Sequence, residues 1–156
     1  MASMPVNHAF MGREYPPTSV YEVGREKIRE FAEAVGATHP AHVDRAAAIA
    51  LGHPDVIAPP TFAVVVAQRA EQQLVADPEA GIDFSRVVHA DERFTHHRPI
   101  FAGMRLSTIL HVDSIAERAG MAMVTTRAEI VTADDGAPVA TVVSTIVVRA
   151  GAEPGA

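Results

Sequence analysis

Residues 59–78 read PPTFAVVVAQRAEQQLVADP, and this stretch decides the fold. Prolines are tolerated at the start of a helix, because the first N–H groups of a helix have no partner inside it. Apolar residues then recur at helical spacing, at Ala63, Val66, Ala67, Ala70 and Leu74. Asp77 precedes a proline, which ends the helix. We therefore predict a long buried helix from about Thr61 to Ala76, with a sheet curled around it. The alternative is that this segment is not a central helix but one of several helices in an α+β domain.

A membrane span is not predicted for this stretch, because a span needs about 20 mostly apolar residues. Polar and charged side chains interrupt it at Gln68, Arg69, Glu71, Gln72 and Gln73. The N-terminus also lacks a charged head followed by an apolar core, which is the pattern of a secretory signal. We therefore expect neither a membrane-spanning protein nor a secreted one.

Length, charge and composition narrow the function classes further. The chain has 156 residues, so we expect one domain at 1–150 and a frayed tail at 151–156. A net charge of −6 without a basic run argues against binding to nucleic acid or to a membrane surface. The absence of cysteine excludes disulfides, thiolate nucleophiles and cysteine metal sites, and it fits a cytoplasmic location.

Two shorter helices are predicted before the long one. Arg25 to Val35 is amphipathic, and Gly36 stands where a left-handed residue would end that helix. Asp44 is a good N-cap for a second helix, from Arg45 to Leu51. The β-branched and aromatic stretch from Thr18 to Val23 is predicted as a first strand.

After residue 85 the hydrophobic period changes from about 3.6 to about 2, which predicts strands. The predicted strands are Arg86 to Arg98, Met104 to Ile115, Met121 to Thr132 and Val139 to Arg149. Hairpin turns are predicted at Ala119-Gly120 and at Asp134-Asp135-Gly136. Helices followed by consecutive antiparallel strands are typical of the α+β class.

The loop between the two shorter helices carries the clearest motif of the chain. It reads Gly36-Ala37-Thr38-His39-Pro40-Ala41-His42-Val43-Asp44, and an alanine-rich stretch follows. This loop resembles the Gly-Asp-x-Asn-Pro-x-His signature, with a further Asp two residues on, of the MaoC-like, R-specific enoyl-thioester hydratases and 3-hydroxyacyl-thioester dehydratases. The positions in register with that signature are Gly36, Pro40, His42 and Asp44.

The resemblance extends over nearly the whole chain. Tyr21 to Phe31, Ala58 to Phe62 and Phe94 to Leu106 are similar to the N-terminal-type MaoC dehydratase domain. In that subfamily the domain occurs in subunits of heterodimeric 3-hydroxyacyl-carrier-protein dehydratases of fatty-acid synthesis. The resemblance implies a hot-dog fold, in which an antiparallel sheet wraps a long helix, and a dimer. It also implies an acyl-CoA or acyl-carrier-protein thioester as substrate and no cofactor.

The chemistry of that family explains its residue types. Elimination of water from a 3-hydroxyacyl thioester removes a proton from C2 and protonates the leaving hydroxyl, work that a His and an Asp can share. The thioester oxygen gains negative charge, so a backbone N–H must point at it. In the hydratases this donor lies in the segment that leads into the long helix.

The sequence departs from the family pattern at both points. Ala37 stands at the position of the catalytic Asp, and His39 stands at the Asn position. Pro60, which has no N–H, aligns with the residue that supplies the donor. The resemblance therefore assigns His42 and position 37 to catalysis, and His39, Pro60 and Thr61 to substrate binding. Thr61 offers a hydroxyl or an N–H where Pro60 offers none.

Each candidate residue also has a simpler interpretation. His42 can be a hydrogen-bonded loop residue, and Asp44 is expected to be a helix cap rather than a catalytic acid. Asp91, Glu92 and Arg93 are expected on a solvated strand face or at a dimer rim. The pairs His39/His42 and His96/His97 suggest metal ligands, but no carboxylate or cysteine is arranged with them, so we predict no metal site.

Three functions are compatible with these residues. The first is an accessory subunit of a heterodimeric dehydratase whose MaoC-like partner supplies an intact Asp/His pair. The second is a self-sufficient homodimeric hydratase that uses His42 with a carboxylate that the sequence does not identify. In a variant of this hypothesis, Ala37 is an engineered replacement of Asp. The third is a non-catalytic hot-dog protein that binds acyl thioesters. We favour the first, because losing one member of a coupled acid–base pair usually costs orders of magnitude in rate.

Overall fold

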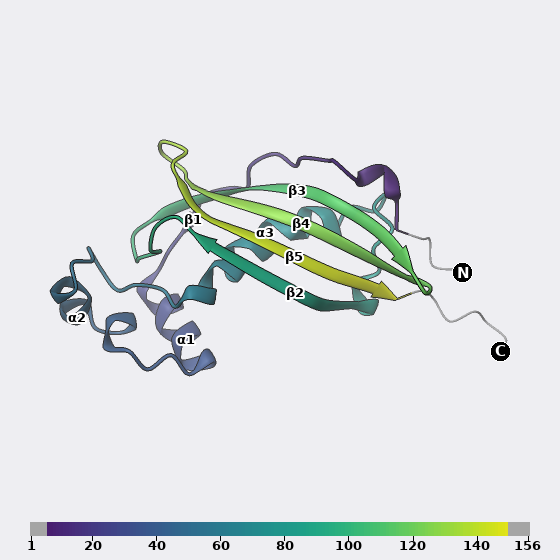
Figure 1. Ribbon diagram of the computed structural model, residues 1–156. Coiled ribbons are helices and arrows are strands. Elements are labelled where there is room, and N and C mark those ends of the chain that lie inside the picture. The colour runs from purple at the N-terminus through teal and green to yellow at the C-terminus, as the bar shows by residue number, and fades with distance from the viewer. Residues whose placement is uncertain (1–5, 150–156) are drawn as a thin grey trace.

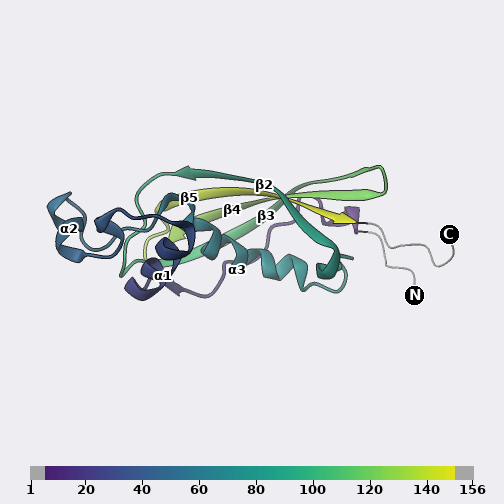
Figure 2. The ribbon, with the colours of Figure 1, turned by 90° about the horizontal axis from the view of Figure 1, so that it is seen from below.

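A computed structural model describes residues 6–149, and in it five antiparallel strands form one curled sheet in the order β1-β3-β4-β5-β2 (Figure 1). The strands are β1 (Tyr21–Glu22), β2 (Val87–His96), β3 (Arg105–Arg118), β4 (Met121–Thr132) and β5 (Pro138–Arg149). The helix α3 (Ala63–Val75) runs along one face of the sheet and contacts β3, β4 and β5 (Figure 2).

The helix α3 is held by small and branched apolar residues on the face that meets the sheet. Ala63, Val66, Ala67, Ala70 and Leu74 are at most 2% exposed. The alanines let the helix approach the sheet closely, and the facing strand residues are equally buried. Those strand residues include Leu106, Leu110, Val124, Ala128, Ile130 and Val142, all at most 1% exposed. A long central helix wrapped by an antiparallel sheet is the hot-dog fold, and the predicted fold is confirmed.

The start of the long helix differs slightly from the prediction. Pro60–Phe62 forms a 3-10 turn, and α-helical geometry begins at Ala63. Pro59 and Pro60 have no N–H, so the chain enters the helix through this tighter turn. Phe62 is fully buried and packs edge-on against Phe31, with ring centroids 5.4 Å apart. This contact fixes the segment before α3 relative to the first helix.

The two shorter helices, α1 (Arg25–Val35) and α2 (Arg45–Ala50), lie together at one end of the sheet (Figures 1 and 2). Gly36 ends α1 in the left-handed conformation, with a φ of 71°, as predicted. The predicted second helix is one residue too long, because Leu51 is its C-cap. A 3-10 turn at Pro40–His42 joins the two helices.

The prediction of the first strand is wrong in extent. Only Tyr21 and Glu22 pair with β3 as a strand, although a strand was predicted over Thr18 to Val23. The residues before them still lie along β3, since the N–H groups of Gly12, Tyr15 and Thr18 donate to carbonyl groups of β3. Pro16 and Pro17 have no N–H to donate, so a continuous ladder cannot form. This N-terminal segment covers one edge of the sheet.

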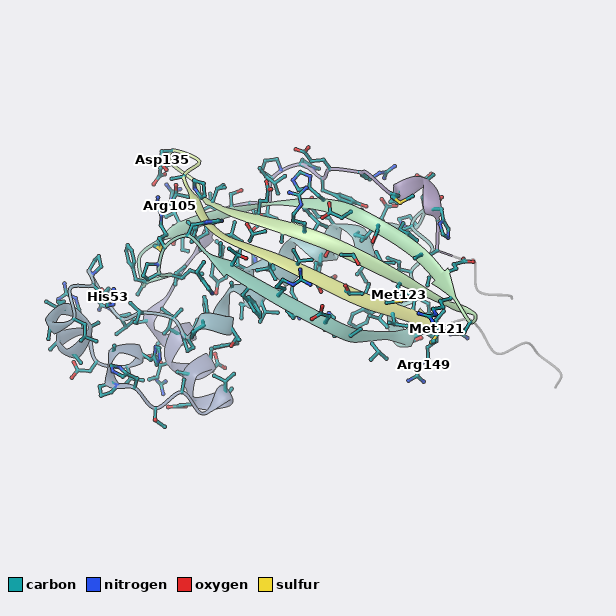
Figure 3. The ribbon with its side chains drawn as sticks, viewed as in Figure 1. His53, Arg105, Met121, Met123, Asp135 and Arg149 are labelled. Atoms are coloured by element: carbon teal, nitrogen blue, oxygen red, sulfur yellow. The ribbon has the colours of Figure 1, made fainter. Side chains whose placement is uncertain are left out.

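The remaining strands follow the predicted alternation. The bounds of β4 match the prediction, β3 continues three residues beyond Ile115, and β2 is shorter than predicted at both ends. Ala119 and Gly120 both have positive φ, 51° and 74°, as a tight hairpin turn requires. Figure 3 shows the two ends of the sheet, with Arg105 and Asp135 at one and Met121, Met123 and Arg149 at the other.

The predicted tail at 151–156 lies outside the described residues. None of the helices in residues 6–149 is long and apolar enough to cross a membrane.

Candidate active site

The motif loop is built from local hydrogen bonds between α1 and α2. The Nδ1 atom of His39 accepts a hydrogen bond from the backbone N–H of Ala41 at 3.1 Å and so caps the 3-10 turn. The carboxylate of Asp44 accepts from the N–H of Ala46 at 2.9 Å and caps α2. The prediction that Asp44 is a helix cap is confirmed.

His42 is buried at the end of this turn, with 9% of its surface exposed. Its Nδ1 atom lies 2.7 Å from the carbonyl oxygen of Ile57. A carbonyl can only accept a hydrogen bond, so Nδ1 carries the hydrogen and Nε2 keeps its lone pair in the neutral ring. His42 is thereby held in the tautomer that a general base needs, with Nε2 as the basic atom.

The segment before α3 is fixed from two sides. Ile57 donates its N–H to the carbonyl of Ala41 at 3.0 Å, and Ala58 donates to the carbonyl of Ile100 at 2.8 Å. The Nε2 atom of His96, at the end of β2, lies 2.7 Å from the carbonyl oxygen of Pro60 and donates to it. Residues 57–60 are therefore held between the motif loop and the chain that follows β2.

A cleft of about 720 Å³ opens between these segments. Its walls combine apolar and proline residues with four histidines and one arginine. The lining residues are His39, His42, Leu51, Ile57, Ala58, Pro59, Pro60, His96, His97, Arg98, Pro99 and Ile100. The fold thus brings together the two histidine pairs that lie more than 50 positions apart in the sequence.

The candidate residues from the sequence divide into two groups. His39, His42 and Pro60 line the cleft, whereas Ala37 and Thr61 are not among its lining residues. Ala37 follows the end of α1, where its N–H donates to the carbonyl of Ala32 at 2.8 Å. Thr61 is exposed within the 3-10 turn before α3.

Sequence reasoning did not place residues 96–98 in this cleft. Histidine, histidine and arginine follow one another there, just before Pro99 and at the end of a predicted strand. The signal that could have found them is this polar, proline-ended run, since functional side chains often follow the end of a strand.

The ionisable side chains that line the cleft are all basic. Of the residues that line it, all within 6–149, none carries a carboxylate, and Arg98 is the one with a permanent positive charge. No group of three or more potential metal ligands was found within residues 6–149. The cleft offers a basic nitrogen on His42 and hydrogen-bond donors, but no acidic partner for that histidine.

Asp55 fixes the position of the segment that contains Ile57. Arg25 of α1 donates two hydrogen bonds to its carboxylate, at 2.9 and 2.7 Å, and Arg45 of α2 lies 3.4 Å away. These hydrogen bonds from Arg25 are the main cause that lowers the pKa of Asp55 to about 2. One carboxylate therefore ties both short helices to the segment that orients His42.

Comparisons with known proteins agree with this architecture. Residues 9–142 match the model of a family described as FAS1-like, dehydratase domain region. A UPF0336 protein of Saccharopolyspora erythraea is 58% identical over 150 residues, which cover 96% of both chains.

Two solved structures are also similar. A chain of the C-terminally truncated HadBC (3R-hydroxyacyl-ACP dehydratase) complex from Mycobacterium tuberculosis is 34% identical, with a TM-score of 0.78. The match covers 88% of this chain and 96% of that one. A MaoC-like dehydratase is 33% identical with a TM-score of 0.81, over 92% of this chain and 43% of the other. The chain belongs to the FAS1-like dehydratase family and is related to the MaoC-like dehydratases.

Proposed function

We propose that this chain is an accessory subunit of a (3R)-hydroxyacyl-thioester dehydratase, the enzyme that also hydrates the enoyl thioester in reverse. A MaoC-like partner supplies the intact Asp/His pair. The observation that carries this proposal is the cleft around His42, where none of the described residues that line the cleft offers a carboxylate to this oriented histidine.

The reaction needs two groups that exchange protons with the substrate. A base removes the proton from C2, and an acid protonates the C3 hydroxyl so that it leaves as water. The Nε2 atom of His42 can perform one of these steps, but Ala37 can perform neither. The carboxylate that would carry the second proton transfer in the family pattern therefore has no counterpart among the described residues that line this cleft.

The site also lacks the expected donor for the thioester oxygen. Pro60 has no N–H, and its carbonyl oxygen accepts the hydrogen bond from His96. Position 60 therefore supplies no N–H group for the thioester oxygen, and a donor from this segment would have to be Thr61. This second deficit supports a role that depends on a partner for catalysis.

The comparisons support the substrate class and the partner. The HadBC structure is described as a complex and as a 3R-hydroxyacyl-ACP dehydratase. We extend both properties to this chain: its substrate is an acyl thioester of carrier protein or coenzyme A, and it works beside a second chain.

A self-sufficient hydratase is the second candidate. The orientation of His42 favours it, because Nε2 is left free and faces no competing hydrogen bond within residues 6–149. The hypothesis of a self-sufficient hydratase requires a carboxylate from a second copy of the chain to reach His42.

Turnover in the presence and absence of a partner tests the proposal. We expect the isolated chain to hydrate a trans-2-enoyl thioester at close to the uncatalysed rate. Mixed with a MaoC-like chain that carries an intact Gly-Asp-x-Asn-Pro-x-His loop, it should support turnover. His42→Ala in this chain should then reduce the rate only modestly, and His53→Ala, outside the cleft, serves as the control. Vigorous activity of the isolated chain that His42→Ala abolishes would establish the second candidate instead.

A further inference from the structure

His39 and His42 stand at the two ends of the short 3-10 turn, and both line the cleft. Their rings meet edge to face, with centroids 6.1 Å apart and ring planes at 71°. His39 is exposed, whereas His42 is buried. A molecule bound in the cleft can therefore contact both rings at once.

The hydrogen bonds of these two rings fix opposite tautomers. A backbone N–H can only donate, so the Nδ1 atom of His39, which accepts from Ala41 at 3.1 Å, holds a lone pair. The hydrogen of the neutral His39 ring is therefore on Nε2. In His42 the bond to the carbonyl of Ile57 puts the hydrogen on Nδ1 and the lone pair on Nε2. One ring thus presents a donor at Nε2, and its neighbour presents a base.

The Nε2–H group of His39 has no hydrogen-bond partner within residues 6–149, where the ring bonds only through Nδ1. Two other histidines of the cleft are already engaged. The Nε2 atom of His96 donates to the carbonyl of Pro60 at 2.7 Å, and the Nε2 atom of His97 lies 3.3 Å from the hydroxyl of Thr141. His39 is therefore the histidine of the cleft whose N–H is available to a bound molecule.

The reaction of the family needs such a donor at the thioester oxygen. This oxygen gains negative charge when C2 loses its proton. Pro60 has no N–H, and Thr61 is not among the residues that line the cleft. A neutral imidazole N–H can stabilise that charge by a hydrogen bond and keep its proton, because the ring without it would be an anion.

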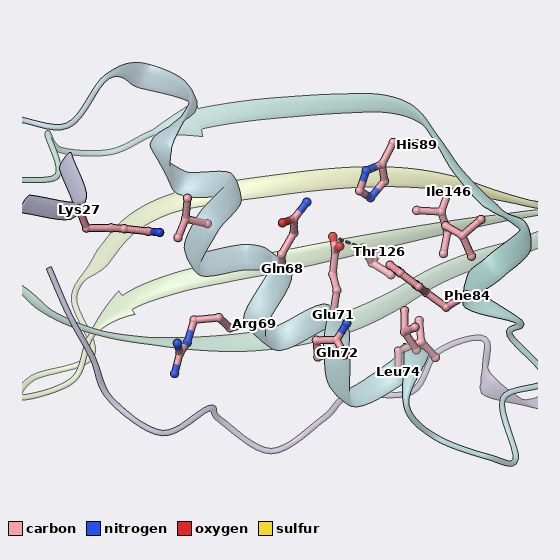
Figure 4. A pocket seen from close by; sticks show the side chains of 13 residues that line it. Lys27, Gln68, Arg69, Glu71, Gln72, Leu74, Phe84, His89, Thr126 and Ile146 are labelled. Carbon is pink, nitrogen blue, oxygen red and sulfur yellow. Dashed lines mark hydrogen bonds between the residues drawn. The ribbon is translucent and has the colours of Figure 1, made fainter. Parts of the chain in front are cut away.

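A second cavity of the described chain offers no group to this site. It holds about 460 Å³ between α3 and the sheet, and its buried acid, Glu71, accepts a hydrogen bond from Thr126 at 3.3 Å (Figure 4). His89 points toward the same carboxyl group. None of the described residues that line this cavity lines the cleft. Glu71 is therefore not the carboxylate that His42 lacks, and the chemistry of the cleft depends on its own side chains.

We infer that the Nε2–H group of His39 donates a hydrogen bond to the thioester oxygen of an acyl thioester in the cleft, in place of the N–H that Pro60 lacks. This inference rests on the substrate class of the proposed function but not on the partner. His39 then caps the turn through Nδ1 and binds the substrate through Nε2. Because C2 is bonded to the thioester carbon, this hydrogen bond brings the reacting carbons next to the basic nitrogen of His42. The carboxylate remains the partner's contribution.

Two substitutions of His39 separate the roles of its two nitrogen atoms. In His39→Asn the amide oxygen can still accept from the N–H of Ala41, but the shorter side chain has no donor at the position of Nε2. In His39→Gln the amide group reaches the position of Nε2 and offers a donor there, but the cap at Nδ1 is lost. The first variant should keep the melting temperature of the native chain, and the second should lower it.

Infrared difference spectroscopy measures the hydrogen bond on the substrate itself. A trans-2-enoyl thioester of coenzyme A, isotope-labelled at the thioester carbonyl, is bound to the isolated chain, which we expect to hydrate it only at the background rate. The carbonyl stretching frequency should be higher in His39→Asn than in the native chain. Calorimetry should give about 5-fold weaker binding, because one neutral hydrogen bond is lost. His39→Gln should retain the native frequency, and His53→Asn, outside the cleft, is the matched control that should change neither quantity.

The outcomes separate the inference from the proposed function. Equal frequencies and affinities in the native chain and in His39→Asn would overturn the inference and leave His39 as a cap alone. A frequency that rises in Arg98→Met instead would also overturn it, because the donor would then be the guanidinium group. A native chain that binds no thioester would contradict it as well, while turnover with a MaoC-like partner would leave the proposed function standing. The expected shift without turnover in any mixture would support the inference and contradict the accessory-subunit proposal.

Discussion

His42 shows how a single hydrogen bond determines what a side chain can do. Its bond to the carbonyl of Ile57 fixes the ring and leaves Nε2 as the basic atom. A histidine without its carboxylate partner keeps the orientation for catalysis but not the second proton-transfer group. Under the proposed function, His42 is therefore one half of an acid–base pair whose other half comes from the partner.

Asp55 is the residue whose removal should disturb that geometry most directly. Asp55→Asn removes a charged group that accepts hydrogen bonds from Arg25, and we expect a loss of about 1–2 kcal/mol in the free energy of unfolding. Because folding lowers the pKa of Asp55 to about 2, its contribution is present above the unfolded value of 3.8 and is lost as the pH falls toward 2. Urea denaturation at several pH values measures this.

The control for Asp55→Asn is Glu30→Gln, at an exposed carboxylate of α1. That change should have little effect at any pH. A stability difference for Asp55→Asn that stays constant between pH 5 and 2 would contradict the assignment of its stabilisation to the ionised carboxylate.

Features of single residues were predictable where they depend only on neighbours in the sequence. The cap at Asp44 and the left-handed Gly36 follow from sequence neighbours alone. The bond from His96 to Pro60 joins residues 36 positions apart, so no local pattern could indicate it. The burial of the Oε1 atom of Glu92 was not predictable for the same reason, although Glu92 is only half-buried and its neighbours Asp91 and Arg93 are exposed, as expected for a solvated strand face.

At the scale of elements, the helix α3 packs closely on the sheet and contacts β3, β4 and β5. Its alanines at 63, 67 and 70 have no exposed surface. The helical spacing of its apolar residues predicted the element well, because a buried stripe must recur every three to four residues. The extent of β1 was not predictable in the same way. Strand propensity does not take into account that Pro16 and Pro17 have no N–H to donate to the neighbouring strand.

Overpacking tests the close contact between α3 and the sheet. Ala67→Leu adds a side chain where no space is left, and we expect a loss of about 1–3 kcal/mol in the free energy of unfolding. Ala76→Leu, at the exposed end of the same helix, should cost much less. Equal effects of the two changes in thermal denaturation would show that α3 is not packed as described.

At the scale of the whole molecule, the outer edge of β2, which pairs with no other strand in residues 6–149, points to assembly. An open strand edge with exposed apolar residues invites pairing, so we expect a dimer of identical or different chains. Light scattering at micromolar concentration measures the mass of the purified chain and of its mixture with a MaoC-like partner. A monomeric mass in both samples would count against this expectation.

The central claim is that this chain has the dehydratase fold and a correctly held His42 but lacks the carboxylate that completes the pair. The rate of hydration of a trans-2-enoyl thioester by the isolated chain, with and without Ala37→Asp, tests it most directly. We predict a rate near background for the native chain and a rise of about 10²-fold for Ala37→Asp, which His42→Ala then cancels. Rapid turnover by the native chain that Ala37→Asp leaves unchanged would contradict the account.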